Sequence, residues 1–212
     1  MRRLIIDTAT NALSVALIDR GGLCSQFHEI VGRGHAELLM PVIAGMDGGG
    51  RADEIWVDSG PGSFTGIRVG VAAARALAFA WGARVRSYSS LSLVAAMAKE
   101  ASALAKQNVI MVALTGGHGE LFWQEFDRES LRPRTAAAST PIAALALETG
   151  VEVIAGTGAE ALICARGHGD ALILHPDARC APLIPHDQVS EDRVPLYGRS
   201  ADAQPARPVG QL

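Results

Sequence analysis

The N-terminal part of the chain has the apolar patterning of three short strands. Residues 4–6 form an apolar run, and Leu13, Val15 and Leu17 occupy alternate positions after the polar turn Thr10-Asn11. A third strand is expected at residues 23–30. The connections are too short for a crossover helix, so we expect an antiparallel meander. Such a start disfavours a nucleotide-binding domain that opens with a strand–helix–strand unit.

Helical spacing replaces this alternation after residue 35. Apolar side chains three and four positions apart predict a helix that ends at the glycine run of residues 48–50. These positions are Leu38, Leu39, Val42, Ile43 and Met46. A strand at residues 54–58, a glycine-rich loop at residues 60–66 and a second helix through Trp81 follow, with Ser63 or Thr65 able to cap that helix. A further strand and helix, near Val85 and residues 91–94, complete the order βββαβαβα.

The second half repeats this order in degenerate form, which predicts two related domains at residues 1–105 and 106–212. Its expected strands lie at residues 109–114, 121–126 and 151–155, and its expected helices at residues 141–148 and 156–165. Beyond Pro176 the chain is punctuated by prolines, and residues 204–212 are expected to form a loose tail.

Composition narrows the class of protein. The chain has 212 residues, of which 49% are hydrophobic and 19% charged, with a formal net charge of −3, so it has enough apolar material for a core. Aromatic residues make up 5%, and the longest basic cluster is Arg2-Arg3, so we exclude a protein that grips nucleic acid unaided. The apolar N-terminal run is too short for a signal peptide or a membrane span, so we expect a soluble cytoplasmic protein.

Cysteine and histidine usage argues against a metal centre. The cysteines, Cys24, Cys164 and Cys180, have no Cys-x-x-Cys spacing, so we expect buried free thiols. None of the six histidines forms a His-x-x-x-His or His-Glu-x-x-His pattern, so a metal site made of protein ligands alone is not expected.

The loop Gly60-Pro61-Gly62-Ser63-Phe64-Thr65-Gly66 lies between a strand and a helix, where backbone N–H groups can converge on an anion. Together with Asp7, which ends the first strand at a turn, it offers weak candidates for a cofactor site at Asp7, Gly60, Gly62 and Ser63. The loop is not a P-loop, because Ile67 stands where a lysine is needed, and Ser63 lacks the Gly-x-Ser-x-Gly register of a nucleophile. Tight packing of strand against helix and a turn aspartate are the alternatives.

A second glycine motif, Gly156-Thr157-Gly158-Ala159-Glu160-Ala161, follows a predicted strand and opens a predicted helix. Its form, Gly-x-Gly-x-x-Ala, resembles a dinucleotide fingerprint. A nucleotide-binding enzyme, either a hydrolase using residues 60–66 or a Rossmann-type enzyme using residues 156–161, is therefore the alternative function.

Three motifs in one order resemble those of the TsaB (YeaZ) family of bacterial proteins. They are Ile6-Asp7-Thr8-Ala9-Thr10, Gly32-Arg33-Gly34-His35-Ala36-Glu37, and the glycine loop continued through Ile67-Arg68-Val69-Gly70. Agreement extends to Ser89-Ser90-Leu91 and, more weakly, to Pro195-Leu196-Tyr197-Gly198-Arg199. Residues 115–122 depart from the family's Asp-Ala-Arg-Arg-Gly-Glu-Val-Tyr, and Gly198 replaces a leucine.

This resemblance implies an α/β fold of the actin/Hsp70/sugar-kinase (ASKHA) type and a role in forming threonylcarbamoyladenosine in tRNAs that read codons beginning with A. It implies a heterodimer with the catalytic subunit TsaD, a ternary complex with the ATPase TsaE, and a homodimer when alone. ATP and a metal ion belong to those partners, and tRNA is reached only through the complex. Residues 88–93 lack the histidines of TsaD's metal motif, so we expect no catalytic residue and no cofactor here, and a scaffold or activator role.

The expected pairing surface lies on the two helices of the first domain. Small residues on the second helix would let another helix approach closely, and the first helix has a broad apolar stripe. The interface residues that we predict are Leu38, Leu39, Val42, Gly66, Gly70, Ala73 and Ala74.

Overall fold

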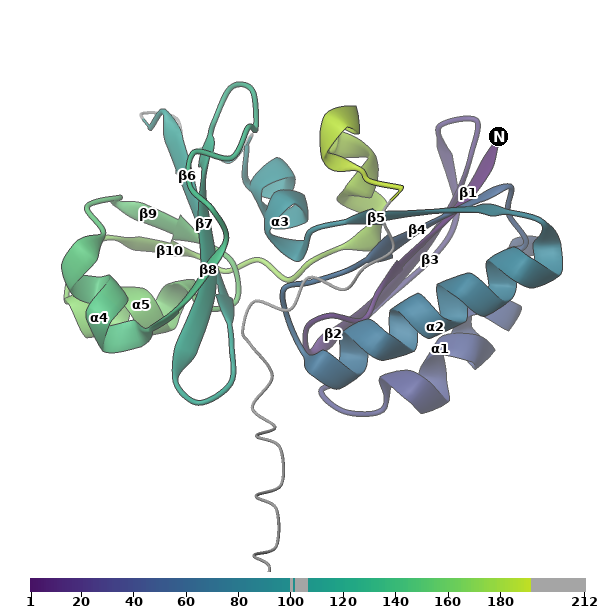
Figure 1. Ribbon diagram of the computed structural model, residues 1–212, viewed down its shortest axis with the longest axis horizontal. Coiled ribbons are helices and arrows are strands. Elements are labelled where there is room, and N and C mark those ends of the chain that lie inside the picture. The colour runs from purple at the N-terminus through teal and green to yellow at the C-terminus, as the bar shows by residue number, and fades with distance from the viewer. Residues whose placement is uncertain (100, 102–106, 192–212) are drawn as a thin grey trace, which may run out of the picture.

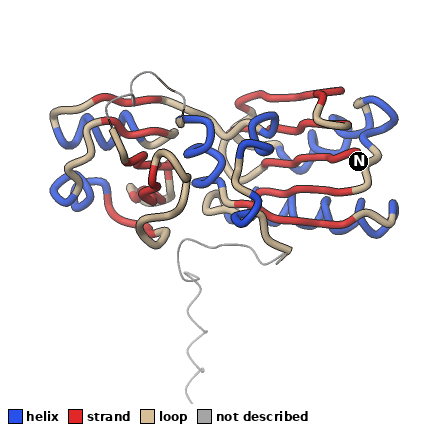
Figure 2. The backbone as a smooth tube through the Cα atoms, turned by 90° about the horizontal axis from the view of Figure 1, so that it is seen from above, coloured by secondary structure: helices blue, strands red, loops and turns tan. Residues whose placement is uncertain are grey.

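The computed structural model describes residues 1–99, 101 and 107–191, which form two lobes built on separate sheets (Figure 1). The first sheet has five strands in the order β3-β2-β1-β4-β5. Its strands are β1 (Arg2–Asp7), β2 (Ala12–Asp19), β3 (Gly22–Ile30), β4 (Glu54–Asp58) and β5 (Arg84–Tyr88). β1, β2 and β3 pair antiparallel, which confirms the expected meander, and β4 and β5 join in parallel. The strands lie side by side in Figure 2.

The second sheet repeats this topology. It also has five strands, in the order β10-β9-β6-β7-β8, so that β6 occupies the central place that β1 has in the first sheet. Its strands are β6 (Val109–Thr115), β7 (Glu120–Asp127), β8 (Ala138–Pro141), β9 (Val153–Ala155) and β10 (Asp170–Leu172). As in the first sheet, the central strand has one antiparallel and one parallel neighbour. The repeat that the sequence suggested is therefore present in strand order and direction.

Helices cover both sheets and also fill the space between them. In the first lobe, α1 (His35–Ala44) and α2 (Phe64–Trp81) lie on one face of the sheet, and α3 (Ser90–Ala98) lies between the lobes (Figure 1). In the second lobe, α4 (Ile142–Glu148) and α5 (Ala159–Arg166) lie side by side on the outside. Short 3₁₀ helices occur at η1 (Asp47–Gly50), η3 (Ala178–Leu183) and η4 (His186–Gln188).

The apolar core has three parts, and the largest of them joins the two lobes. Under α1 and α2, one cluster includes Leu4, Leu39 and Ile67, and a small cluster under α4 and α5 includes Leu145. The central cluster combines Trp56 of the first sheet with α3 and with residues of the second sheet. The two lobes therefore share the central one of these three clusters.

The chain returns to the first lobe after the second sheet is complete. We call residues 176–191 the strap. The backbone N–H of Ala178 donates to Ser14 Oγ at 2.9 Å, and Ser190 and Ser87 exchange two backbone hydrogen bonds of 2.8 and 2.9 Å. Since η3 of the strap packs on β2 while α1 also covers that strand, β2 is buried along nearly its whole length. The stretch assigned from sequence to the second domain thus includes a segment that packs on the first lobe.

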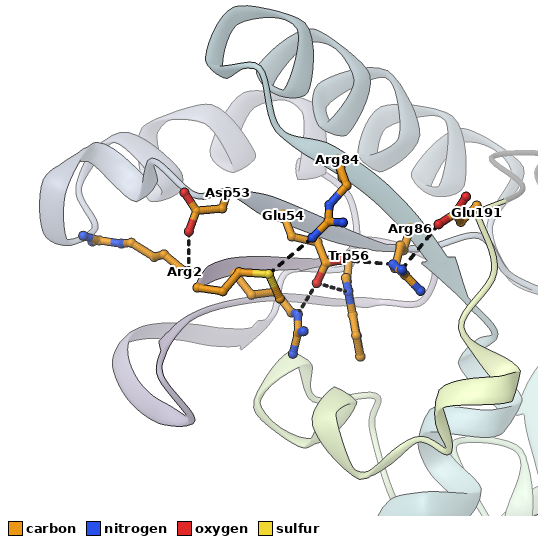
Figure 3. Close-up of polar contacts among 9 residues, drawn as sticks. Arg2, Asp53, Glu54, Trp56, Arg84, Arg86 and Glu191 are labelled. Carbon is orange, nitrogen blue, oxygen red and sulfur yellow. Dashed lines mark hydrogen bonds and ion pairs between the residues drawn. The ribbon is translucent and has the colours of Figure 1, made fainter.

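An ion-pair network at the start of β4 ties the strap to the edge of the sheet (Figure 3). Glu54, whose side chain is 3% exposed, accepts hydrogen bonds from Arg3 Nε at 2.8 Å and Trp56 Nε1 at 3.0 Å, and it forms an ion pair with Arg86 Nε at 3.0 Å. Burial alone raises the pKa of Glu54, but the hydrogen bond and charge of Arg3, the hydrogen bond from Trp56 and the charge of Arg86 outweigh it and lower that pKa. Arg86 also pairs with Glu191 of the strap at 3.3 Å.

Several expectations need correction. The strands β8 and β10 were not expected, because they are three or four residues long and show no clear alternation. Cys24 and Cys164 are exposed rather than buried, because Cys24 lies on edge strand β3 and Cys164 on the outer side of α5, although all three cysteines are free as predicted. The tail at residues 204–212 and the motif at residues 195–199 lie outside the described residues.

Candidate functional site

Two aspartates meet where β1 and β4 end. Asp7 and Asp58 are the last residues of these parallel neighbours, so their side chains project from the same edge of the sheet. Both are fully buried. Asp58 Oδ1 accepts the backbone N–H of Gly60 at 2.7 Å, and Oδ2 accepts the hydroxyl of Ser90 at 2.6 Å. Each oxygen of Asp58 therefore has a donor.

Asp7 is less well satisfied. Its Oδ1 accepts the backbone N–H of Ala9 at 3.2 Å, whereas the buried Oδ2 has no hydrogen-bond partner in the part of the chain that the structure describes. Burial, followed by the charge of Asp58, raises the pKa of Asp7 well above its usual value. Burial also raises the pKa of Asp58 and of Tyr88, whose hydroxyl donates to Ile6 O at 3.4 Å. The pair is suited to holding a proton inside the fold.

The glycine loop packs on the β1–β2 turn. The backbone N–H of Ser63 donates to Ala9 O at 2.6 Å, and Thr8 Oγ1 donates to Gly66 O at 2.7 Å. A Cβ at Gly66 would lie far inside van der Waals contact with Thr8 O, so glycine is needed there for close approach.

Ser63 is the N-cap of α2, and its Oγ accepts the N–H of Gly66 at 3.2 Å, as the sequence suggested. The N–H groups of Gly60, Ser63 and Gly66 thus all donate to acceptors within the chain. This arrangement fits the alternative of strand-to-helix packing better than a phosphate cradle.

The second glycine motif is built in the same way. It follows β9 and precedes α5, as expected, but the N–H of Gly158 donates to Ala113 O at 2.9 Å on β6. A Cβ at Gly156 would also overlap Ala113 O. Thr115 donates two further hydrogen bonds to Thr157, from its N–H to Thr157 Oγ1 at 3.0 Å and from its hydroxyl to Thr157 O at 3.1 Å. The motif is the counterpart of the first glycine loop and packs on its own sheet, which argues against a dinucleotide site.

Two segments, residues 88–93, which lack the histidines of TsaD's metal motif, and residues 115–122, which depart from the family pattern, have structural roles. Ser89 caps α3 by accepting the N–H of Leu91 at 3.2 Å, and Ser90 binds Asp58. Residues 115–122 form the end of β6, a turn closed by Gly116 N–H to Glu120 O at 2.9 Å, and the start of β7. Among the described residues, no group of three or more histidine, cysteine or acidic side chains could hold a metal ion.

The predicted interface residues divide between the inside and the surface of the first lobe. Four of them are buried on the inner sides of α1 and α2, namely Leu39, Gly66, Gly70 and Ala74. Leu38 is 39% exposed, and Val42 and Ala73 are half-buried. A glutamate at Gly70 or Ala74 would therefore disrupt the packing of α2 on its own sheet, and neither position can report on pairing alone.

The outward faces of α1 and α2 carry large apolar residues that the sequence pattern did not single out. Met40 is 45% exposed, Phe64 is 49% exposed and Phe79 is 93% exposed. α2 has more apolar positions than one buried stripe requires, and this excess could have indicated Phe64 and Phe79. α2 is also long and apolar enough to cross a membrane, but its glycine and alanine face packs on the first sheet and it carries Arg68 and Arg75.

Comparisons with known proteins identify the family. The family model for TsaD, the tRNA N6-adenosine threonylcarbamoyltransferase, matches residues 27–146. The tRNA threonylcarbamoyladenosine biosynthesis protein TsaB of Haemophilus influenzae is 34% identical over 135 residues, which cover 61% of this chain and 55% of that protein. The Escherichia coli protein of the same name is 32% identical over 134 residues, covering 61% and 56%. The chain thus matches about half the length of these curated relatives.

Solved structures agree with the fold. An uncharacterised Pseudomonas aeruginosa protein with similarity to the peptidase YeaZ is 26% identical with a TM-score of 0.73, covering 93% of this chain and 99% of that one. YeaZ from the same organism has a TM-score of 0.74 at 24% identity, covering 92% and 99%. The repeated strand order and these matches establish the actin/Hsp70/sugar-kinase-like fold. The chain belongs to the TsaB/YeaZ family.

Proposed function

We propose that this protein is a non-catalytic subunit of the cytoplasmic machinery that makes threonylcarbamoyladenosine in tRNA, and that it acts by pairing with a TsaD-type subunit. Family membership supports the pathway, since the relatives are described as tRNA threonylcarbamoyladenosine biosynthesis proteins. In this proposal a TsaE-type subunit completes the assembly, and tRNA is bound only by the complex. ATP and a metal ion are held by the partners, and the chain alone forms a homodimer.

The observation that carries the proposal is the apolar outer surface of α1 and α2. These helices lie side by side on the face of the first sheet that points away from the second lobe (Figure 1). Leu38 and Met40 on α1, and Phe64 and Phe79 on α2, expose between 39% and 93% of their surface. Exposed aromatic and aliphatic anchors of this kind mark protein interfaces, and a specific interface buries roughly 1,600 Å² in total.

The non-catalytic part of the proposal rests on groups that the chain uses internally. Asp58 accepts from Gly60 and Ser90, and the N–H of Ser63 donates to Ala9. A catalytic carboxylate or an anion-binding loop must instead direct such groups at a substrate. These contacts leave the first lobe better suited to support a partner's active site than to provide one.

Phe79→Glu and Leu147→Glu test the pairing surface as a matched pair. Both residues are at least 90% exposed and lie on helices, Phe79 on α2 and Leu147 on α4, so neither substitution should disturb folding. We expect Phe79→Glu to weaken association with the TsaD-type subunit at least a hundredfold, about 3 kcal/mol, because it places a carboxylate among the apolar anchors. Leu147→Glu should associate like the wild type.

Sedimentation and pull-down of the folded variants measure this association. Wild-type affinity in Phe79→Glu would remove the α1 and α2 surface from the proposal. A separate assay supplies threonylcarbamoyl adenylate and tRNA to the purified chain with and without the TsaD-type subunit. Product from the chain alone would overturn the non-catalytic role.

A further inference from the structure

The buried ends of β1 and β4 pose a problem of hydrogen bonding. Asp7 and Asp58 end neighbouring parallel strands in a place where neither is exposed, and a carboxylate oxygen can only accept. Asp58 already receives one donor on each oxygen. Asp7 Oδ2 has no partner among the described residues, and an unsatisfied buried oxygen costs free energy. A single proton on Asp7 resolves the problem, because Oδ2 then becomes a donor to Asp58.

We propose that Asp7 and Asp58 hold one shared proton, carried on Asp7, and that this proton stabilises the contacts that attach α2 and α3 to the first sheet. Two ionised carboxylates at this site would repel each other without water to screen them, whereas a protonated carboxyl and a carboxylate form a strong hydrogen bond. Asp58 is the ionised member, because its oxygens have donors from Ser90 and Gly60. The inference concerns the chain by itself and does not depend on the proposed function.

The neighbouring titratable groups strengthen the need for the proton. The charges of Asp58 on β4 and Asp177 before η3 raise the pKa of Asp7, and the charge of Asp7 raises the pKa of Tyr88 on β5. Each of these three neighbours is neutral or negative. Asp177 has its own cationic partner, since Arg179 pairs with it at 2.5 Å. The hydrogen bonds from Arg179, and to a lesser extent the nearby His28, lower the pKa of Asp177. The negative surroundings leave protonation as the way to relieve repulsion between Asp7 and Asp58.

The proton lies where two helices are attached to the sheet. Asp58 holds Ser90, the first residue of α3, and α3 belongs to the core shared by both lobes. Asp7 holds the N–H of Ala9, and the carbonyl of Ala9 holds Ser63, the N-cap of α2. Ionisation of the pair would therefore loosen both the packing between the lobes and the seating of α2.

Folding is consequently coupled to proton uptake. An aspartate in the unfolded chain has a pKa of about 3.9, so at a pH between this value and the folded pKa, Asp7 binds a proton when the pair forms. A group whose pKa is raised on folding contributes most below its unfolded pKa, and this contribution is lost as the pH rises toward the folded pKa. Over that window the folding equilibrium constant falls tenfold for each unit of pH, as far as this pair is concerned.

Asp7→Asn removes the proton but keeps a donor, because the asparagine amide can donate to Asp58 without titrating. Exposed Asp170→Asn is the matched control for loss of one aspartate. Urea unfolding is measured for the wild type and both variants from about pH 5 to about pH 8. We expect the ratio of wild-type to Asp7→Asn folding constants to fall about tenfold for each unit by which the pH rises below the folded pKa of Asp7, and Asp170→Asn to follow the wild type. Parallel curves for the wild type and Asp7→Asn would overturn the proposal.

Infrared spectroscopy of the folded protein gives a second measurement that does not require the variant to fold. A protonated carboxyl has a carbonyl stretch separate from that of a carboxylate. We expect this band in the wild type near neutral pH, unchanged in Asp170→Asn and absent from folded Asp7→Asn. If Asp7→Asn does not fold, the wild-type spectrum decides, because a protein without the band has two ionised carboxylates and no shared proton.

Discussion

Glu54→Gln is expected to destabilise the protein by about 2–3 kcal/mol. Removing one partner from a fully buried ion pair costs about 3–5 kcal/mol, since it leaves an uncompensated charge. Glu54 is 3% exposed, but Arg3 and Arg86 keep 18% and 24% of their side-chain surface, so water offsets part of that cost. The glutamine carbonyl can still accept from Trp56 Nε1, which bonds Glu54 at 3.0 Å in the wild type. The partial exposure of the arginines and the retained hydrogen bond from Trp56 place the expected loss of stability below the cost for a fully buried ion pair.

Urea unfolding at neutral and acidic pH provides the assay, with Glu29→Gln on the exposed edge strand β3 as the control. The pKa of Glu54 is lowered on folding, so its contribution is present above the unfolded value of about 4.3 and is lost as the pH falls through the folded value. The gap between wild type and Glu54→Gln should therefore narrow in acid, while Glu29→Gln stays within about 0.5 kcal/mol of the wild type. A neutral-pH effect of Glu54→Gln below about 0.5 kcal/mol would refute the reasoning, because the network would then behave like exposed ion pairs.

Two further substitutions test the glycine loop. Ser63→Ala should lower the free energy of unfolding by about 0.5–2 kcal/mol because it removes the N-cap of α2, whereas exposed Thr65→Ala should have little effect; equal losses in urea unfolding would contradict the assigned cap. Gly66→Ala should destabilise by at least about 1–3 kcal/mol because its Cβ would press on Thr8 O, and Gly150→Ala, which meets nothing within 4 Å, is the control; a stable Gly66→Ala would show that the loop can move away from β1.

Local patterning accounted for most of the first lobe. The alternation in β2 and the spacing of Leu39 and Ile43 in α1 predict their elements directly, because each has a face that must be buried. Periodicity cannot say whether an apolar stripe covers its own sheet or a partner. Gly66, Gly70 and Ala74 looked like a docking surface from sequence, but Gly66 and Gly70 let α2 approach Thr8 after the end of β1, and Ala74 is buried. Exposed Phe79 was the more informative position.

The candidate site shows a different limit. Asp7 could be singled out because it ends a strand at a turn, but Asp58, 51 positions later, becomes its neighbour only through the parallel pairing of β1 with β4. The strap was missed for a similar reason. Its contacts with Ser14 and Ser87 join residues far apart in the chain, and a proline-punctuated stretch has no periodicity that would indicate them.

The strap has a consequence for how the protein is made. The hydrogen bond from Ala178 to Ser14 joins residues 164 positions apart, so the first lobe lacks part of its core until most of the chain has left the ribosome. At synthesis rates of about 5–20 residues per second, the N-terminal sheet, whose last strand ends at Tyr88, waits roughly five to twenty seconds with one apolar face incompletely covered. In that interval the nascent β2 exposes a surface that chaperones bind and that can misassociate.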